Sequence, residues 1–302
     1  MEQNMKRGAA FAILAAALYA INAPFSKIML HYMPPTLMAG FLYIGAGFGM
    51  ILIAFTRKLR KAETNELRLT KSELPYTVAM ILLDIAAPIC LMIGLNSTTA
   101  ANASLLNNFE IVATAIIALM VFKEKISSRL WLGILFVTLS CAILSFEDIS
   151  SFHFSYGSLF VLLAAVCWGF ENNCTRKISL KDPMQIVLLK GVFSGIGSIM
   201  IGLSIGERIT AFWSIAAVCC IGFIAYGLSI YFYVYAQRLL GAARTSAYYA
   251  IAPFIAAILS LVIFREKPGI DYFIALAFML IGAWLSSEDK PLFKNSPTTH
   301  TE

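Results

Sequence analysis

Charged side chains are scarce in this sequence. Its 302 residues are 59% hydrophobic and only 13% charged, with a mean hydropathy of +0.78. Soluble domains carry about 25% charged residues. So few charges cannot cover the surface of a water-soluble protein of this length. The composition therefore predicts a polytopic membrane protein whose surroundings are the lipid bilayer.

The sequence also lacks most of the motifs of enzymes and of cofactor sites. It contains no HExxH, paired-aspartate or Walker pattern, so metal-dependent hydrolysis and ATP-driven chemistry have no residues to carry them. The string GxSxG occurs at 202–206 (GLSIG), where an apolar segment ends. The six cysteines form no CxxC pair, and the histidines lie apart at His31, His153 and His300. We therefore expect no metal site, no cofactor and no nucleic-acid partner.

Apolar segments fill most of the chain. Ten of them approach or reach the length that one helix needs to cross a bilayer: 8–30, 35–55, 75–95, 100–122, 128–146, 157–175, 184–204, 211–235, 242–264 and 270–287. With ten spans, 18 of the 23 basic residues fall on the side of the N-terminus and three on the other. The positive-inside rule then places both termini in the cytoplasm. The net charge of +6 belongs to this topology signal.

The two halves of the chain repeat each other. At an offset of 149 residues the aligned pairs include Gly8 and Gly157, Tyr19 and Trp168, Asn22 and Glu171, and Lys27 and Arg176. At an offset of 142, residues 122–125 (FKEK) align with residues 264–267 (FREK). Each unit has five helices, and since five is odd the units cross the membrane in opposite senses. Inverted repeats are typical of secondary transporters, with the substrate site near the midplane; a duplication kept only for packing is the alternative.

Ten helices, a duplicated five-helix unit and two F-[KR]-E-K tags resemble the EamA-type members of the drug/metabolite transporter superfamily over essentially the whole chain. The resemblance implies an all-α polytopic membrane protein with ten transmembrane helices as two inverted five-helix repeats. The repeats occupy 1–146 and 147–288, and a cytoplasmic tail follows at 289–302. Pro253 matches a proline that relatives carry before the tag, whereas Ile111 stands at the equivalent place in the first half.

Glu110 is the most unexpected side chain, because it lies near the middle of segment 100–122. A carboxylate at that depth is costly unless it is paired, protonated or hydrated. On a continuous helix it would share one face with Asn107 and Thr114. Since apolar surroundings favour the neutral form, Glu110 could carry a proton, with Asp84 on the third span sharing or relaying it. Alternatively, ionised Glu110 could hold a cationic group of the substrate.

Matching polar stripes on the first and sixth spans predict one central cavity. Tyr19, Asn22 and Ser26 form the first stripe, and Trp168, Glu171 and Thr175 form its repeat equivalent. The candidates for substrate binding or coupling are Glu110, Asn107, Asp84, Asn22, Tyr19, Trp168, Glu171, Tyr226, Tyr248 and Tyr249. The asparagines could instead join helices by hydrogen bonds, the aromatic residues could be filler, and a Glu171–Lys190 ion pair could be structural.

Small residues and prolines predict local helix geometry. GxxxG pairs at 45–49 in the second span and at 191–195 and 202–206 in the seventh, its repeat equivalent, predict close helix crossings that serve packing or sliding. Prolines predict kinks at Pro24, Pro88 and Pro253, which free backbone groups near a cavity.

These features predict a secondary transporter of the cytoplasmic membrane. It would move a small metabolite, such as an amino acid or similar amphipathic solute, by alternating access, with proton-coupled export as the candidate mode. A membrane-embedded lipid-acting enzyme is one alternative, although the sequence has no HExxH or paired-aspartate motif. A passive channel is the other, although a channel does not require polar stripes at both ends of a central site. The pattern carries no signal for oligomeric state.

The predicted topology can be tested by labelling cysteines. We expect Ser151→Cys, in the connection 147–155, to react with a membrane-impermeant maleimide added to intact cells. Ser72→Cys, in the basic connection 56–74, should react only after permeabilisation. Labelling of Ser151→Cys from the inside alone would contradict the inverted arrangement.

Overall fold

The computed structural model describes residues 2–59, 67–123, 126–148, 153–178, 181–240, 245 and 248–287. The last two residues of the first tag, part of the 56–74 connection, Ser151 and the tail 289–302 lie outside this set. The helices of the first half are α1 (Glu2–Ala20), α2 (Asn22–Met29), α3 (Pro35–Leu59), η1 (Lys71–Glu73), α4 (Leu74–Ser97), α5 (Ala100–Leu106), α6 (Phe109–Phe122) and α7 (Ser128–Ser145).

A short antiparallel pair of strands, β1 (Phe146–Asp148) and β2 (His153–Phe154), connects the halves. The helices of the second half are α8 (Tyr156–Ile178), α9 (Pro183–Leu189), η2 (Lys190–Ser194), α10 (Gly195–Ser204), α11 (Trp213–Gly222), η3 (Phe223–Leu228), α12 (Ser229–Leu240), α14 (Ala252–Phe264) and α15 (Ile270–Ser287). Of these, η1 is a 3₁₀ turn, and η2 and η3 are π-helical turns inside longer helices.

Joined end to end, these pieces give the ten predicted transmembrane helices in the described part of the chain. Seven stretches are long and apolar enough to cross a membrane by length and composition; α8, α14 and α15 provide the other three passes. The first span breaks at Ile21, between α1 and α2, just before Pro24. Pro88 lies inside α4, and Pro253 is at the start of α14.

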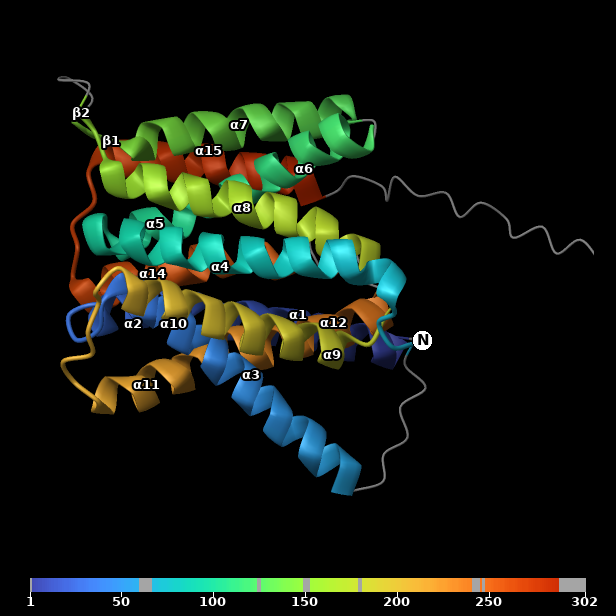
Figure 1. Ribbon diagram of the computed structural model, residues 1–302. Coiled ribbons are helices and arrows are strands. Elements are labelled where there is room, and N and C mark those ends of the chain that lie inside the picture. Colours follow the sequence, from blue (N-terminus) through green and yellow to red (C-terminus); the bar gives the residue numbers. More distant parts are fainter. Residues whose placement is uncertain are drawn as a thin grey trace, which may run out of the picture.

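The packing of the helices repeats between the halves. The third span packs against the sixth (α4 on α8), and the eighth packs against the first in the same way (α12 on α1). Likewise α6 contacts α8, and its repeat equivalent α14 contacts α1. The equivalent fifth and tenth spans, α7 and α15, pair with each other at one edge of the bundle (Figure 1). This pattern confirms two inverted five-helix repeats.

Both F-[KR]-E-K tags end a helix in the same way. Lys123 follows α6 with φ of 53°, and Arg265 follows α14 with φ of 52°. Among the described residues these are the two non-glycine positions with positive φ. A left-handed residue closes the C-terminus of a helix, so the repeated tag is a helix stop. The tags lie at opposite ends of the bundle because α6 and α14 run in opposite directions (Figure 1).

The second tag also contributes to a polar cluster at its end of the bundle. Lys27 Nζ donates to the carbonyl oxygens of Leu95 and Thr98, at 2.6 and 2.8 Å, and thereby satisfies the C-terminus of α4. The carboxyl group of Glu266 interacts with Lys27 and with Thr99. Burial raises the pKa of Glu266, although the attraction of Lys27 opposes that rise.

Glycines bring the backbones of three spans together. A Cβ atom on Gly191 would overlap Gly47, so α3 and η2 touch through their main chains. On another side of α3, a Cβ atom on Gly222 would overlap the carbonyl oxygen of Leu42. The close helix crossings that the glycine pairs predict are therefore present. The 191–195 pair meets the second span at Gly47 and Ile44, whereas the 45–49 pair meets the eighth span at Cys219 and Phe223.

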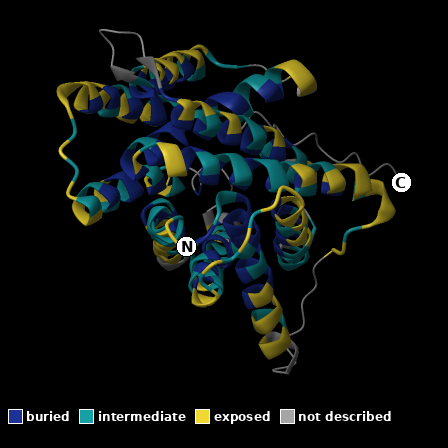
Figure 2. Cartoon of the chain, turned by 60° about the vertical axis from the view of Figure 1, so that its left-hand side comes forward, coloured by how far each residue is buried: buried dark blue, intermediate teal, exposed yellow. Residues whose placement is uncertain are grey.

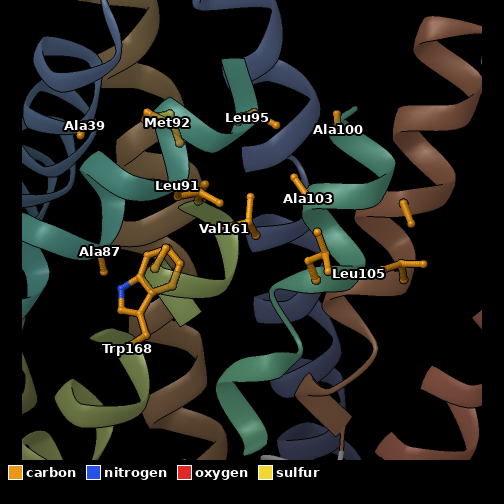
Figure 3. Close-up of a cluster of buried hydrophobic side chains, with 14 of the residues drawn as sticks. Ala39, Ala87, Leu91, Met92, Leu95, Ala100, Ala103, Leu105, Val161 and Trp168 are labelled. Carbon is orange, nitrogen blue, oxygen red and sulfur yellow. The ribbon is translucent and has the colours of Figure 1, made fainter. Parts of the chain in front are cut away.

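The outside of the bundle is apolar, as expected for contact with lipid. Large apolar side chains such as Leu82, Met200 and Val262 are exposed, and exposed residues line the outer helix faces and loops (Figure 2). Inside, small and large apolar side chains interdigitate: Ala87 and Leu91 of α4 lie beside Trp168 of α8 (Figure 3). Apolar side chains thus form both the buried core of the bundle and its outer, lipid-facing surface.

Enlarging a crossing glycine should break the fold. Gly222→Val would drive a branched side chain into the backbone of α3, and overpacking of this kind costs about 1–3 kcal/mol or more. We expect the variant to lose its monodisperse peak in fluorescence-detected size-exclusion chromatography. The matched control is Gly227→Ala in η3, where the added atom has its nearest neighbour, Phe223 Cδ2, at 3.2 Å. Normal behaviour of Gly222→Val would show that α3 and α11 do not cross so closely.

Candidate substrate and ion-coupling site

A small cavity lies between the two repeats, near the breaks in the helices. Its volume is about 20 Å³, and its lining comes from α1, α2, α4, α5 and α14. The polar lining residues are Tyr19, Asn22, Ser104 and Asn107, and Pro253 closes one side. A space of this size holds a water molecule but not a metabolite. The structure is therefore a closed form of the cavity.

A break in the fourth span directs Asn107 toward this cavity. Helix α5 ends at Leu106 and α6 begins at Phe109, so Asn107 and Asn108 lie in the turn between them. Asn107 Nδ2 donates to the hydroxyl of Tyr19 at 3.3 Å. Asn107 is only 8% exposed, and its Oδ1 has no hydrogen-bond partner among the described residues. A buried acceptor is thus left next to the cavity.

Tyrosine rings form one side of the same region. Asn22 Nδ2 donates to the hydroxyl of Tyr226 on η3 at 3.1 Å. The ring centroid of Tyr226 is 5.9 Å from that of Tyr19 and 5.2 Å from that of Tyr43, and Tyr249 is 6.0 Å from Tyr19. These rings come from both repeats and offer neutral hydroxyl groups and aromatic faces.

Glu110 faces a different neighbour from Asn107. Its Oε1 accepts a hydrogen bond from Asn172 Nδ2 of α8 at 2.5 Å, and the same nitrogen lies 3.4 Å from Thr114 Oγ1. The turn at residues 107–108 interrupts the helix between Asn107 and the other two members of the predicted stripe, but its backbone stays right-handed and both Asn107 and Glu110 interact with Tyr19. Among the described residues no cation lies within ion-pair distance of Glu110.

A second group of charges joins the third, sixth and seventh spans. Lys190 Nζ, at the start of η2, lies 2.5 Å from Glu171 Oε1 and 3.2 Å from Asp84 Oδ2. Tyr43 donates its hydroxyl to Asp84 Oδ1 at 2.9 Å, and the Thr175 hydroxyl donates to Glu171. We call Asp84, Glu171 and Lys190 the triad. Asp84 is 1% exposed and Glu171 4%.

The triad confirms one sequence prediction and adds an ion pair that was not predicted. The predicted Glu171–Lys190 ion pair is present. The direct contacts of Asp84 are with Lys190 and Tyr43, while Glu110 interacts with it electrostatically; the proton relay between Asp84 and Glu110 stays a prediction. The sequence alone does not reveal that α4 packs on α8 and η2 at this depth, so the second ion pair was missed.

The other predicted residues fall in varied surroundings. Trp168 is buried in the hydrophobic core between α4 and α8 (Figure 3). Tyr249 is half-buried, with its hydroxyl 3.4 Å from Ser229 Oγ. Tyr248 is 41% exposed and is not brought together with the buried tyrosines. Tyr43 and Asn172 were not predicted; Asn172 follows Glu171 on the polar sixth span, which was the available signal.

Comparison with known proteins agrees with this architecture. A family model, that of the EamA-like transporter family, matches residues 6–146 and 155–288, one match in each half. The chain belongs to the EamA-like transporter family. Because this is a family of transporters, membership in it argues against the alternative of a lipid-acting enzyme. This member of the family is thus a multi-pass membrane transporter with a small-molecule substrate.

Individual relatives and a solved structure are similar over most of this EamA-like transporter. An uncharacterized transporter of Methanothermobacter thermautotrophicus is 26% identical over 90% of this chain and 84% of its own. The inner membrane transporter YedA of Escherichia coli is 22% identical over 87% and 85%. A probable amino-acid metabolite efflux pump of Salmonella typhimurium is 23% identical over 61% and 58%. One crystal structure matches with a TM-score of 0.67 at 16% identity, covering 96% of this chain and 98% of that chain.

The triad predicts a specific order of stabilities. Lys190→Met strands two buried carboxylates, and breaking a buried pair costs about 3–5 kcal/mol, so this variant should have the lowest Tm. Adding Glu171→Gln should recover part of the loss, because one stranded charge is then removed. The measurement is a thermal-stability assay in detergent over the full double-mutant cycle.

The control is a lysine in an exposed ion pair of the same protein. Lys181 Nζ lies 3.3 Å from Glu73 Oε1, with both side chains partly exposed. Such pairs contribute about 0–1 kcal/mol, so Lys181→Met should change Tm little. Additive effects of Lys190→Met and Glu171→Gln would show that these residues do not interact.

Proposed function

We propose that this EamA-like transporter exports a small amphipathic solute of the amino-acid class by alternating access, with proton coupling, and that the central cavity is its substrate site. The observation that supports the proposal most is the position of the cavity. It lies between the two repeats, beside two broken spans, with an unsatisfied amide oxygen of Asn107 at its edge. In transporters built from inverted repeats, broken helices and midplane sites occur together.

The side chains around the cavity suit a solute with an amino group, a carboxylate and an apolar part. Asn22 and Asn107 offer amide donors and acceptors. The tyrosine faces can pack on an apolar part or attract an ammonium group. Glu110 lies close enough to Tyr19 and Tyr249 to interact with them electrostatically, so it can supply the negative charge for an ammonium group.

Entry of a solute requires the helices around the closed cavity to separate. The breaks at Ile21 and at residues 107–108 are where the first and fourth spans change direction. The glycine contacts of α3 with η2 and η3 allow spans to slide without large side chains interlocking. Opening first at one end and then at the other gives alternating access.

Export and orientation rest on two further observations. The distribution of basic residues supports an orientation with both termini and the 56–74 connection in the cytoplasm. A relative at 23% identity is named a probable amino-acid metabolite efflux pump. We carry that direction and substrate class over to this chain as part of the proposal.

Transport assays can distinguish a Glu110 that binds the ammonium group of the substrate from a Glu110 that carries a proton. In proteoliposomes assayed with a panel of radiolabelled amino acids, we expect Glu110→Gln to abolish both accumulation and exchange between equal pools, because the ligand for the ammonium group is lost. Loss of accumulation with intact exchange would instead make Glu110 the proton carrier. Wild-type rates of both would make it structural. Flux that does not saturate would indicate a channel.

The matched control neutralises a carboxylate away from the cavity. Glu207 accepts hydrogen bonds from the backbone N–H groups of Thr36 and Leu37, at 3.2 and 2.8 Å, and so caps α3. Glutamine keeps one acceptor oxygen for the shorter of these bonds, from Leu37 N–H, and the site is remote from the cavity, so Glu207→Gln should transport at the wild-type rate. Equal losses in both variants would show that the effect of Glu110→Gln is not specific to the cavity.

A further inference from the structure

The triad carries more negative than positive charge. Two carboxylates, Asp84 and Glu171, share the single ammonium group of Lys190, so the fully ionised triad has a net charge of −1. The other ionisable groups that face it are Tyr43 from α3, Tyr226 from η3, Cys174 from α8 and Glu110 from α6. None of these supplies a positive charge.

A net charge at this depth is unfavourable. Removing an ion from water into a membrane protein costs several kcal/mol unless another charge compensates it. One bound monovalent cation would make the triad neutral. Lys190 Nζ already lies between the two carboxylates, at 2.5 and 3.2 Å from their oxygens, so a metal ion would have to displace it. A proton needs no such space, and two neighbouring carboxylates are known to share one.

The repeat shows that charge is not needed for packing at this place. Under the two repeat offsets, Asp84 is equivalent to Tyr226 and Glu171 to Asn22. In the other half these equivalents meet as a neutral hydrogen bond, Asn22 Nδ2 to Tyr226 OH at 3.1 Å. The same helix contact is therefore made with uncharged side chains. Helix packing alone therefore does not explain why the residues of the triad are charged.

We propose that Asp84 and Glu171 form the proton-binding site of the transporter, which holds one exchangeable proton, with Lys190 as its permanent counter-ion. A carboxylate oxygen takes a proton from water at one end of the bundle and returns it to water at the other. With the proton bound, the triad is neutral and holds α4, α8 and η2 together. Without it, two carboxylates compete for one ammonium group, and the excess charge favours opening to water.

The position of Lys190 suits such a site. It is the first residue of the π-turn η2, and π-turns occur frequently at functional sites. The next residue, Gly191, touches the backbone of α3, and Ser194 Oγ donates to the carbonyl oxygen of Ile81 on α4 at 3.3 Å. The backbone of η2 is thus fixed against α4, which carries Asp84, and against α3, whose Tyr43 donates a hydrogen bond to Asp84.

The bound proton can be observed without knowing the substrate. Infrared difference spectroscopy between acidic and alkaline pH detects the C=O stretch of a protonated carboxyl group. The measurements use full-length protein in vesicles, in a Glu110→Gln background that removes the other carboxyl group of this region. Contributions of all remaining carboxyl groups cancel when variants of the triad are compared.

The charge count fixes the expected results. The Glu110→Gln protein should show the band of one triad carboxyl group. Adding Asp84→Asn should remove it, because Glu171 and Lys190 then neutralise each other; if Asp84→Asn does not fold, Glu171→Gln leaves the same net charge. Adding Lys190→Met should instead enlarge the band about twofold, since two acids then lack a cation. Absence of the band in Glu110→Gln, or no change with the triad variants, would overturn the proposal.

The link to transport rests on the proposed function and has its own measurement. In vesicles containing a pH-sensitive dye, the amino-acid panel should move protons with wild type and with Glu207→Gln, but not with Asp84→Asn. If wild type moves no amino acid while the band behaves as expected, the proton site stands and the proposed function fails. If amino acids move normally but the triad band is missing, the proton site fails and the proposed function stands.

Discussion

The contact of one lysine with two carboxylates links the spans on which the rest of the structure depends. Asp84 comes from the first repeat, whereas Glu171 and Lys190 come from the second. In lipid an uncompensated charge is expensive, so these three spans are held in a single register. One of them, α4, also lines the cavity between the repeats through Leu91, so the triad and the cavity share a helix.

Irregular backbone occurs beside the polar side chains. The first span breaks at Ile21 next to Asn22, the fourth breaks at Asn107, and Lys190 lies in a π-turn. Broken helices leave backbone groups without their usual partners, and within a membrane this is tolerated only where protein or water can satisfy them. The polar residues and the helix breaks therefore occur at the same places in the bundle, and both lie away from the lipid-facing surface.

The sequence predicted the fold well because its evidence was redundant. Apolar length, basic residues and the repeated tag all indicated ten spans in two inverted units, and even the helix stop at Lys123 and Arg265 follows the repeat. The site was harder to predict, since it depends on which faces meet. A helical stripe assumes a continuous helix, and no local pattern revealed the turn at residues 107–108 that separates α5 from α6. Asp84 meets Lys190 only through the packing of α4 on η2, which no local pattern encodes.

The two halves of the chain show how one architecture can hold two kinds of chemistry. Equivalent helices meet at equivalent positions, but one meeting point is the neutral pair Asn22 and Tyr226 and the other is the charged triad. The neutral pair lies by the cavity and can vary with the solute without altering any ionic charge. Under the proposals made above, the charged half would bind a proton without contacting the solute. A duplicated unit would then divide substrate recognition and ion coupling between two related places, which the contact of Tyr226 with Tyr43 connects.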